Sequence, residues 1–214
     1  MDMSETRRRI LDTARRLFNE AGVSRVGVRE VARALEMSPG NLAYHFPTKD
    51  DLVEALVVEL HELNLATVFA DMPRAMSIET LYRLATGAMR NMIPYRFVLL
   101  GYADAVSRSR PLRKLEATLA EKRRARHDMM LAALALGDWI ERDALGRSET
   151  LYEQSTMISS GWMSIAAVRG WRDREAIPHF AKLGCALLEP HCTPKGKKQM
   201  RRVLSGELDA GGES

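Results

Sequence analysis

Apolar residues recur every three or four positions along most of this chain, which is the spacing of one face of an α-helix. The first stripe ends at Gly22, a residue type that favours the backbone turn after a helix. Its members are Ile10, Leu11, Ala14, Leu17, Phe18 and Ala21. A second stripe contains Val28, Val31, Ala32 and Leu35. The sequence shows neither the alternation of a β-strand nor an internal repeat, so we expect an all-α fold.

Helix-start signals then bracket a short helix. Ser38 offers a hydroxyl that can cap free backbone N–H groups, and Pro39 beside it has a φ angle preset for the first helical position. Pro47 ends this helix, because the residue before a proline disfavours helical geometry. Thr48, with Asp51 three residues later, is the next start signal. The segment therefore predicts two short helices at a tight turn and then a longer helix, which is a helix-turn-helix with its exit helix.

The short helix has the residues that a DNA-reading helix needs in its first turn. That turn enters the major groove, so it has to be small enough to approach the bases and polar enough to bond them. Pro39, Gly40 and Asn41 meet this need, while Tyr44 and His45 are expected to reach sugar and phosphate. The spacing leaves one alternative open, an ordinary three-helix bundle in which proline and glycine only mark the ends of helices.

After Pro73 the chain stays helical in pattern. Short interruptions separate five further helices, which we expect at 77–91, 95–108, 111–136, 148–169 and 174–189. Residues 193–208 allow two interpretations, a solvated C-terminal helix or a basic tail that touches DNA or acidic lipid. The tail 206–214 is predicted to be disordered.

Composition is consistent with this organisation. At 214 residues with 46% hydrophobic content, the chain can bury a hydrophobic core without the help of disulfide bonds. Cys185 and Cys192 lack the paired spacing of a zinc site, which favours a reduced, cytoplasmic setting. The first residues have no apolar core of a signal peptide, and no run approaches the roughly 18 uncharged residues that a membrane span needs. We therefore expect no membrane partner.

The net charge of +4 is weak evidence for nucleic-acid binding. Residues 1–60 contain nine basic and ten acidic residues, so the predicted DNA-binding head has a net charge of −1. What matters for phosphate binding is the face presented, and Arg7 to Arg9 and Arg29 can line it while the acids point away.

The sequence contains no complete catalytic or metal-binding motif. His61 and Glu62 begin an HExxH-like string, but the second histidine is absent. No Gly-rich phosphate loop or GxSxG nucleophile elbow occurs. We therefore expect no catalytic residue, no metal, no cofactor and no enzymatic activity.

The last two predicted helices are the candidates for a dimer interface, because small residues on their apolar faces allow close approach. The candidate interface residues are Ile158, Gly161, Trp162, Ile165, Ile177, Phe180, Ala181, Gly184 and Leu188. Two such helices from each subunit would form a four-helix bundle about a two-fold axis. The alternative is that both faces pack only within the subunit.

Large or pliable apolar side chains in the C-terminal part can line a pocket for a small molecule. Methionine adapts to varied ligand shapes, although apolar side chains at helical spacing more often pack in the protein core. The candidate ligand-binding residues are Met89, Met92, Phe97, Tyr102, Met130 and Trp162.

The first sixty residues resemble the TetR family of bacterial transcriptional regulators. The similarity lies in RRRILDTARRLFNEAGV, VREVARALEMS and PGNLAYHFPTKDDL. It implies a homodimer that binds a two-fold, palindromic operator in double-stranded DNA. It further implies a helix-turn-helix domain at 1–50, joined by the helix that starts after Thr48 to a helical ligand-binding and dimerisation domain at 51–205. The DNA contacts it implies are Arg29, Ser38, Pro39, Gly40, Asn41, Tyr44, His45 and Lys49.

The chain departs from the family pattern at three positions. Ala43 stands where an aromatic residue commonly precedes the tyrosine, so one contact to DNA is in doubt. Gly27 replaces the usual threonine or serine cap of the second helix and brings no side-chain bond. Glu36 occupies the turn position where the family favours glycine, and a left-handed backbone there costs a non-glycine residue about 1 kcal/mol.

These observations predict a regulator, with repression as its expected action, that a small hydrophobic effector releases from DNA or repositions on it. The effector acts through its different affinities for two arrangements of the helical domain. The alternative is a helical small-molecule-binding or adaptor protein without specific DNA binding.

Overall fold

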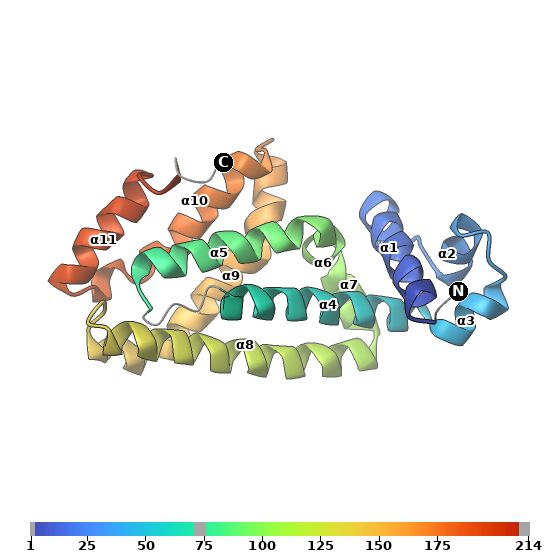
Figure 1. Cartoon of the computed structure of the whole chain (residues 1–214), viewed down its shortest axis with the longest axis horizontal. Coiled ribbons are helices and arrows are strands. Elements are labelled where there is room, and N and C mark those ends of the chain that lie inside the picture. Colours follow the sequence, from blue (N-terminus) through green and yellow to red (C-terminus); the bar gives the residue numbers. More distant parts are fainter. Residues whose placement is uncertain (1–2, 71–75, 210–214) are drawn as a thin grey trace. The chain divides into compact units, whose positions relative to one another are not determined.

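The structure is a computed structural model and describes residues 3–70 and 76–209. Over these residues it is helical, with no strand and one isolated bridge between Ile140 and Cys192 (Figure 1). The all-α prediction is confirmed. None of the helices in the described ranges is both long and apolar enough to cross a membrane.

Contacts divide the chain into two compact units, each of which takes two stretches of sequence. Unit 1 consists of Met1–Leu63 and Asn91–Leu119, and unit 2 consists of Asn64–Arg90 and Ala120–Ser214. The predicted boundary at residue 50 thus falls inside unit 1.

Unit 1 contains α1 (Met3–Ala21), α2 (Val28–Ala34), α3 (Pro39–His45) and the first part of α4 (Lys49–Ala70). It also contains η1 (Ile93–Tyr95), α6 (Arg96–Leu100), α7 (Tyr102–Arg108) and the first part of α8 (Arg110–Leu136). One apolar core joins both stretches, since Ile10, Phe18, Leu42 and Leu56 share it with Phe97. The helix-turn-helix head is therefore completed by residues some forty positions beyond it.

The single helix predicted at 95–108 is two helices in the structure. Gly101, with φ −153° and ψ −3°, ends α6 and precedes α7. Its N–H donates to the carbonyl of Phe97 at 3.0 Å. Glycine has the lowest helix propensity after proline, so the break falls there.

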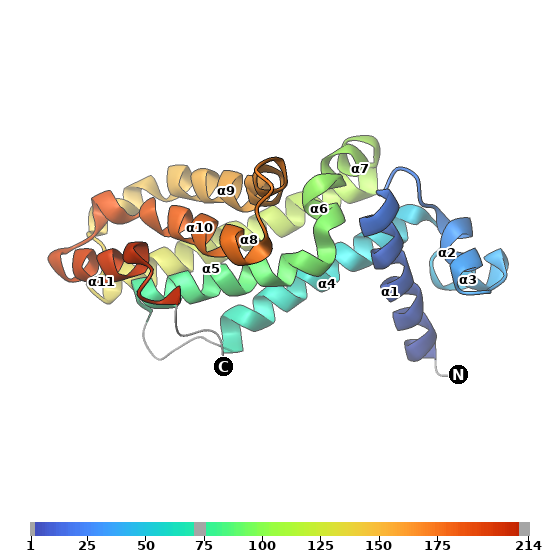
Figure 2. The same ribbon diagram turned by 90° about the horizontal axis from the view of Figure 1, so that it is seen from above.

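Unit 2 contains α5 (Ile78–Met92) for most of its length, the later part of α8, and η2 (Arg142–Arg147). It continues with α9 (Ser148–Val168), α10 (Asp173–Ala186), η3 (Glu189–His191) and α11 (Pro194–Ser205). Helices α9 and α10 lie side by side, and α11 packs against α10 (Figure 2).

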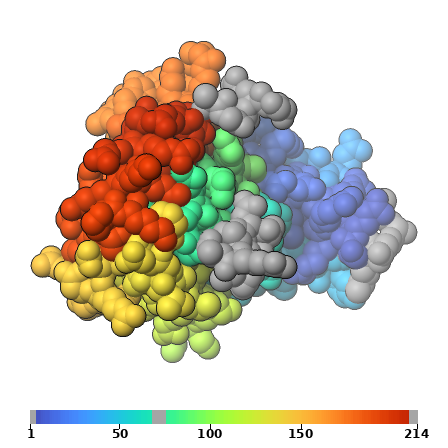
Figure 3. Space-filling model, turned by 60° about the vertical axis from the view of Figure 1, so that its left-hand side comes forward, coloured from blue at the N-terminus to red at the C-terminus, as the bar shows by residue number. Residues whose placement is uncertain are grey.

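The basic segment near the C-terminus forms the amphipathic helix α11. Gly196, Met200 and Val203 are buried, while Lys197 and Lys198 are exposed at the surface of unit 2, where α11 forms part of the face in Figure 3. Of the two interpretations of residues 193–208, the structure shows the helix.

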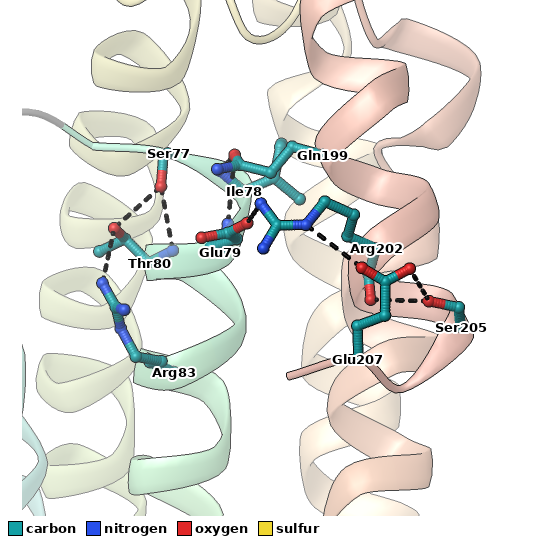
Figure 4. A network of polar contacts seen from close by, with 9 residues as sticks. All are labelled: Ser77, Ile78, Glu79, Thr80, Arg83, Gln199, Arg202, Ser205 and Glu207. Carbon is teal, nitrogen blue, oxygen red and sulfur yellow. Dashed lines mark hydrogen bonds and ion pairs between the residues drawn. The ribbon is translucent and has the colours of Figure 1, made fainter. Parts of the chain in front are cut away.

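Polar side chains of α11 fix the start of α5 (Figure 4). The Gln199 Oε1 atom accepts hydrogen bonds from the backbone N–H groups of Ile78 at 2.9 Å and Glu79 at 3.4 Å. Arg202 forms an ion pair with Glu79 at 2.6 Å. A helix begins with N–H groups that lack intrahelical partners, so this contact satisfies two of them from a distant segment.

The prediction of disorder from residue 206 was wrong for residues 206–209. Gly206 ends α11 with φ 87°, and the Asp209 carboxylate accepts hydrogen bonds from Tyr82 and Lys182. These bonds connect the tail to α5 and α10, which local sequence did not reveal. Residues 210–214 of the predicted tail lie outside the described residues.

Candidate DNA-binding site

Helix α2 begins with a cap built from the third residue of the helix. Gly27 is the N-cap, with extended backbone at φ −125°, and its N–H donates to the Glu30 carboxylate at 2.9 Å. Hydrogen bonds from the backbone N–H groups of Glu30 and Gly27 hold the pKa of the Glu30 carboxyl below its usual value. The reciprocal bond from a cap side chain is absent because glycine has none.

The turn between α2 and α3 passes through a left-handed residue. Glu36 has φ 55°, and the N–H of Met37 returns to the carbonyl of Ala32 at 2.9 Å. The predicted left-handed backbone at Glu36 is confirmed. The Cβ atom of glutamate is accommodated at a cost, because this region is unfavourable for L-residues other than glycine, asparagine and aspartate.

Helix α3 starts as the sequence predicts. Ser38 has extended backbone, its Oγ atom accepts a hydrogen bond from the Asn41 N–H at 3.2 Å, and Pro39 takes the first helical position. The start of α4 is capped in the same way, since Thr48 and Asp51 exchange hydrogen bonds between side chain and backbone.

Two buried anchors and one arginine hold α3 in place. Leu42 and Phe46 are 0% and 1% exposed, so one side of α3 is committed to the core. Arg7 of α1 donates to the carbonyl of His45 at 3.1 Å, and its guanidinium lies 4.1 Å from the centre of the Phe46 ring. Sequence reasoning placed Arg7 on the phosphate-facing surface and missed this positioning role, which no local pattern signals.

The opposite side of α3 is exposed and carries most of the predicted contacts. Pro39, Gly40 and Asn41 are exposed, and Tyr44 is 75% exposed. His45 is half-buried, with its ring edge-on to that of Tyr44. The predicted contacts Ser38 and Arg29 are exposed as well. The structure therefore brings together the small first turn and two aromatic groups on one short helix.

Lys49 is placed differently from the rest. It is half-buried, and its ammonium group donates to the carbonyl of Val23 at 3.1 Å, beyond the end of α1. An ammonium has three donors, so two remain for other acceptors. Lys49 therefore holds the start of α4 against the turn after α1, in addition to any contact with phosphate.

The groove between α1 and α4 has the wrong charge for DNA. Besides Arg7, Leu11, Ala55 and Val58, it is lined by Asp51, Glu54, Glu59 and Glu62. Carboxylates repel phosphate, so within unit 1 the α3 face is the surface suited to a duplex.

The structure distributes the predicted ligand-binding residues between two units. Phe97 and Tyr102 are buried in the core of unit 1, with Met92 packed against it. Met89, Met130 and Trp162 belong to unit 2, where Trp162 is fully buried. Phe97 serves the packing of the DNA-binding head, and spacing along the chain did not reveal that role.

The predicted dimer residues also differ in exposure. Trp162, Ile177, Phe180, Ala181 and Leu188 are buried within the single chain, so their side chains have little surface left for a partner. The remaining predicted residues, Ile158, Gly161, Ile165 and Gly184, are half-buried or exposed. The helical period identified apolar faces but did not separate the side that packs inward from the side that faces out.

In the described part of the chain, no group of three or more His, Cys, Asp or Glu side chains is arranged to hold a metal ion. Both cysteines are free and buried. Burial raises the pKa of the Cys185 thiol to about 12 and that of Cys192 to about 11, so neither is poised as a nucleophile.

Helix α3 is capped and exposed and follows α2 across a tight turn, which defines a helix-turn-helix within a chain that is helical over its described residues. The family model described as "Bacterial regulatory proteins, tetR family" matches residues 10–56. The model described as "Bacterial transcriptional repressor" of TetR type matches residues 61–200. The chain belongs to the TetR family of bacterial transcriptional regulators.

Curated relatives match over a short stretch. The chain is 36% identical over 61 residues to the HTH-type transcriptional regulator UidR of Escherichia coli K12, which is 28% of this chain and 31% of that protein. It is 41% identical over 64 residues to the regulator AcrR of Shigella flexneri, which is 30% of this chain and 29% of that protein. The matched part thus spans about a third of these relatives.

Solved structures match over most of the chain. A TetR-family transcriptional regulator from Marinobacter aquaeolei VT8 superposes with a TM-score of 0.79 at 23% identity, over 98% of both chains. Salmonella enterica GusR superposes with a TM-score of 0.68 at 20% identity, over 88% of this chain and 98% of that one. At these identities the similarity shows the fold.

Proposed function

We propose that this protein is a ligand-responsive transcriptional regulator that binds a palindromic operator as a homodimer through α3. The observation that carries the proposal is the first turn of α3, which is exposed at Pro39, Gly40 and Asn41 while Leu42 is buried behind it. Repression is the action we expect, as the family model's description indicates.

The roles of the α3 residues follow from their chemistry. Asn41 has a donor and an acceptor that match the edge of adenine, and therefore carries base preference. Tyr44 and His45 reach the backbone, whereas exposed Arg29 at the start of α2 supplies a charge to a phosphate. Contacts to phosphate fix the register of the head, and contacts to bases select the sequence.

A symmetric operator needs two heads, and exposed apolar side chains on α9 and α10 suit a second copy. Met157 and Val168 of α9 are 74% and 89% exposed, and Ile165 and Leu183 are 43% and 45% exposed. Burial of such side chains drives association in homodimers. We propose these four, together with Gly161 and Gly184, as the dimer face in place of the buried residues.

A continuous helix is available for control by an effector. Residues 49–63 of α4 belong to unit 1 and residues 64–70 to unit 2. An effector that favours one arrangement of unit 2 would change the separation of the two heads through α4. The effector can change operator affinity only by as much as its own affinities for the two arrangements differ.

The test is selection of bound fragments from random duplex DNA by the full-length protein, followed by fluorescence anisotropy on the selected site. We expect a palindromic consensus. Asn41→Ala should change the preferred base at one position of each half-site. Arg29→Ala and Lys49→Ala should instead weaken binding to DNA of every sequence and flatten the salt dependence of binding. Lys122→Ala, which removes an exposed charge on α8, is the matched control and should leave base preference and salt dependence unchanged.

Failure to enrich any fragment would contradict DNA binding and favour a ligand-binding or adaptor protein. Identical behaviour of the Asn41 and Arg29 variants would contradict the division of roles between them.

A further inference from the structure

Helix α8 places a guanidinium on a face that otherwise continues into the core of unit 2. Arg126 is half-buried, and Met130 and Leu134 follow it by one and two helical turns. Met130 is half-buried and Leu134 is 1% exposed. Residues four apart lie on one face of a helix, so a cation occupies a position where the pattern calls for an apolar residue.

Arg126 has no ion-pair or hydrogen-bond partner in residues 3–70 and 76–209. The nearby charge on its own helix is Arg123, which is also positive. Burial, and then the charge of Arg123, lower the pKa of the Arg126 guanidinium. A partly buried cation without a counter-ion costs stability, which is why such groups are normally paired.

The neighbouring carboxylate is already committed to other groups. Asp128 accepts a hydrogen bond from Ser148, and its Oδ1 atom lies 3.4 Å from Arg124 Nε and 3.5 Å from His127 Nδ1. Asp128 therefore pairs with Arg124 and His127 and not with Arg126.

Tyr152 of α9 packs against α8 beside Arg124 and His127. Its hydroxyl donates to the carbonyl of Ala120 at 3.2 Å, and the Arg124 guanidinium lies 5.2 Å from its ring centre. Tyr152 also acts electrostatically on Arg126. This face of α8 thus offers the guanidinium of Arg126 and, one helical turn later, the side chain of Met130.

We propose that Arg126 binds an organic anion, an oxyanion head group attached to an apolar body, on the face of α8 in unit 2 that Arg126 shares with Met130. The guanidinium fork pairs with a carboxylate or phosphate in two parallel hydrogen bonds, and Met130 receives the apolar body. This inference rests on the proposed function, because it names the chemical class of the effector.

The probes are decanoate and decyl phosphate, which share the tail and differ in the oxyanion. Decyltrimethylammonium has the same tail with the opposite charge, and inorganic phosphate has the oxyanion without a tail. Isothermal titration calorimetry on the full-length protein should show saturable binding of at least one of the two anionic amphiphiles. It should show little or no binding of decyltrimethylammonium and of inorganic phosphate.

Arg126→Gln should weaken that binding by about tenfold or more, because the two charge-assisted hydrogen bonds are lost. Arg126→Lys should recover part of it, since the charge remains without the fork. Lys122→Gln removes an exposed charge one turn earlier on α8 and should leave the affinity unchanged. Equal loss in the Arg126 and Lys122 variants would mean non-specific attraction and would overturn the proposal.

The ligand-free protein gives an independent measurement. Arg126→Met should raise the melting temperature, because the uncompensated charge is removed and the apolar face is completed. A lowered melting temperature, or a dimer dissociation constant that rises with Arg126→Gln in sedimentation, would show that Arg126 serves packing or a partner subunit. Either result overturns the proposal, as does the absence of binding by both anionic amphiphiles.

Operator binding without any probe separates this proposal from the proposed function. If selected DNA is never bound while Arg126 controls anion affinity, the regulator fails and the anion site stands. If DNA is bound and neither anion binds, the anion site fails and the regulator stands.

Discussion

The ring of Phe18 in α1 packs against the ring of Phe97 in α6, with centres 5.4 Å apart and planes inclined at 52°. Next to this pair, the Asn19 side chain donates to the carbonyl of Pro94 at 2.7 Å and accepts from the N–H of Phe97 at 3.0 Å. The first helix of the DNA-binding head is thus fixed by a segment that follows α5.

Phe97→Ala should lower the free energy of unfolding by about 3–5 kcal/mol, because it removes a buried ring and leaves a cavity beside Phe18. Chemical denaturation followed by circular dichroism measures this. Leu100→Ala on the same helix is the control, since Leu100 is 54% exposed and should change stability little. Equal effects of both substitutions would contradict the assignment of Phe97 to the core.

Glu36→Gly should raise the free energy of unfolding by about 1 kcal/mol and leave operator affinity unchanged, because glycine adopts the left-handed backbone without a penalty. Thermal denaturation is the measurement. Glu36→Ala is the control for loss of charge, since alanine retains the Cβ atom and should bring no comparable gain. An unchanged or lower melting temperature for Glu36→Gly would argue against strain in this turn.

Gly40→Ala should preserve or raise stability by up to about 1 kcal/mol while weakening operator binding. A Cβ atom at this position would meet no other heavy atom within 4 Å among the described residues. The fold therefore gives no reason for glycine here, whereas close approach to DNA does. Melting and anisotropy measurements on the same variant distinguish a structural from a DNA-binding reason for glycine. Unchanged affinity would show that the first turn of α3 does not contact DNA closely.

Gly196→Ala should lower the free energy of unfolding by about 2–3 kcal/mol, because its Cβ atom would lie 1.9 Å from the Trp139 carbonyl oxygen. Gly146→Ala is the matched control, since nothing lies within 4 Å of its Cβ position. Comparable melting temperatures of the two variants would show that α11 does not approach this carbonyl so closely.

Acidification should destabilise the protein through His127. Burial lowers the pKa of this imidazole, although the Asp128 side chain works in the opposite direction. The unfolded chain therefore binds the proton more readily, so the contribution of His127 is complete above about pH 6.5 and is lost as the pH falls below that value. His127→Gln should flatten the melting temperature between about pH 5 and 7, and His179→Gln, at an exposed position, should not.

The sequence by itself determined the local features of the head. The two helix starts, Ser38 with Pro39 and Thr48 with Asp51, depend on backbone geometry within four residues, so residue types at fixed spacing predict them. The left-handed turn at Glu36 was expected from the family resemblance instead. The all-α class and the exposed first turn of α3 follow from the same short-range rules, together with the family resemblance.

Only the tertiary structure decided which apolar faces pack inward and which distant residues meet. Phe97 looked like a pocket residue and lies in the core of the head, and Gln199 caps a helix that begins more than a hundred residues earlier. On α9, Trp162 shares a helical period with exposed Ile165, and on α10 Phe180 shares one with half-buried Gly184, yet Trp162 and Phe180 are buried. The physical reason is that helical spacing gives the direction of a side chain about its own axis, whereas burial depends on what packs against that side, and sequence period does not contain that information.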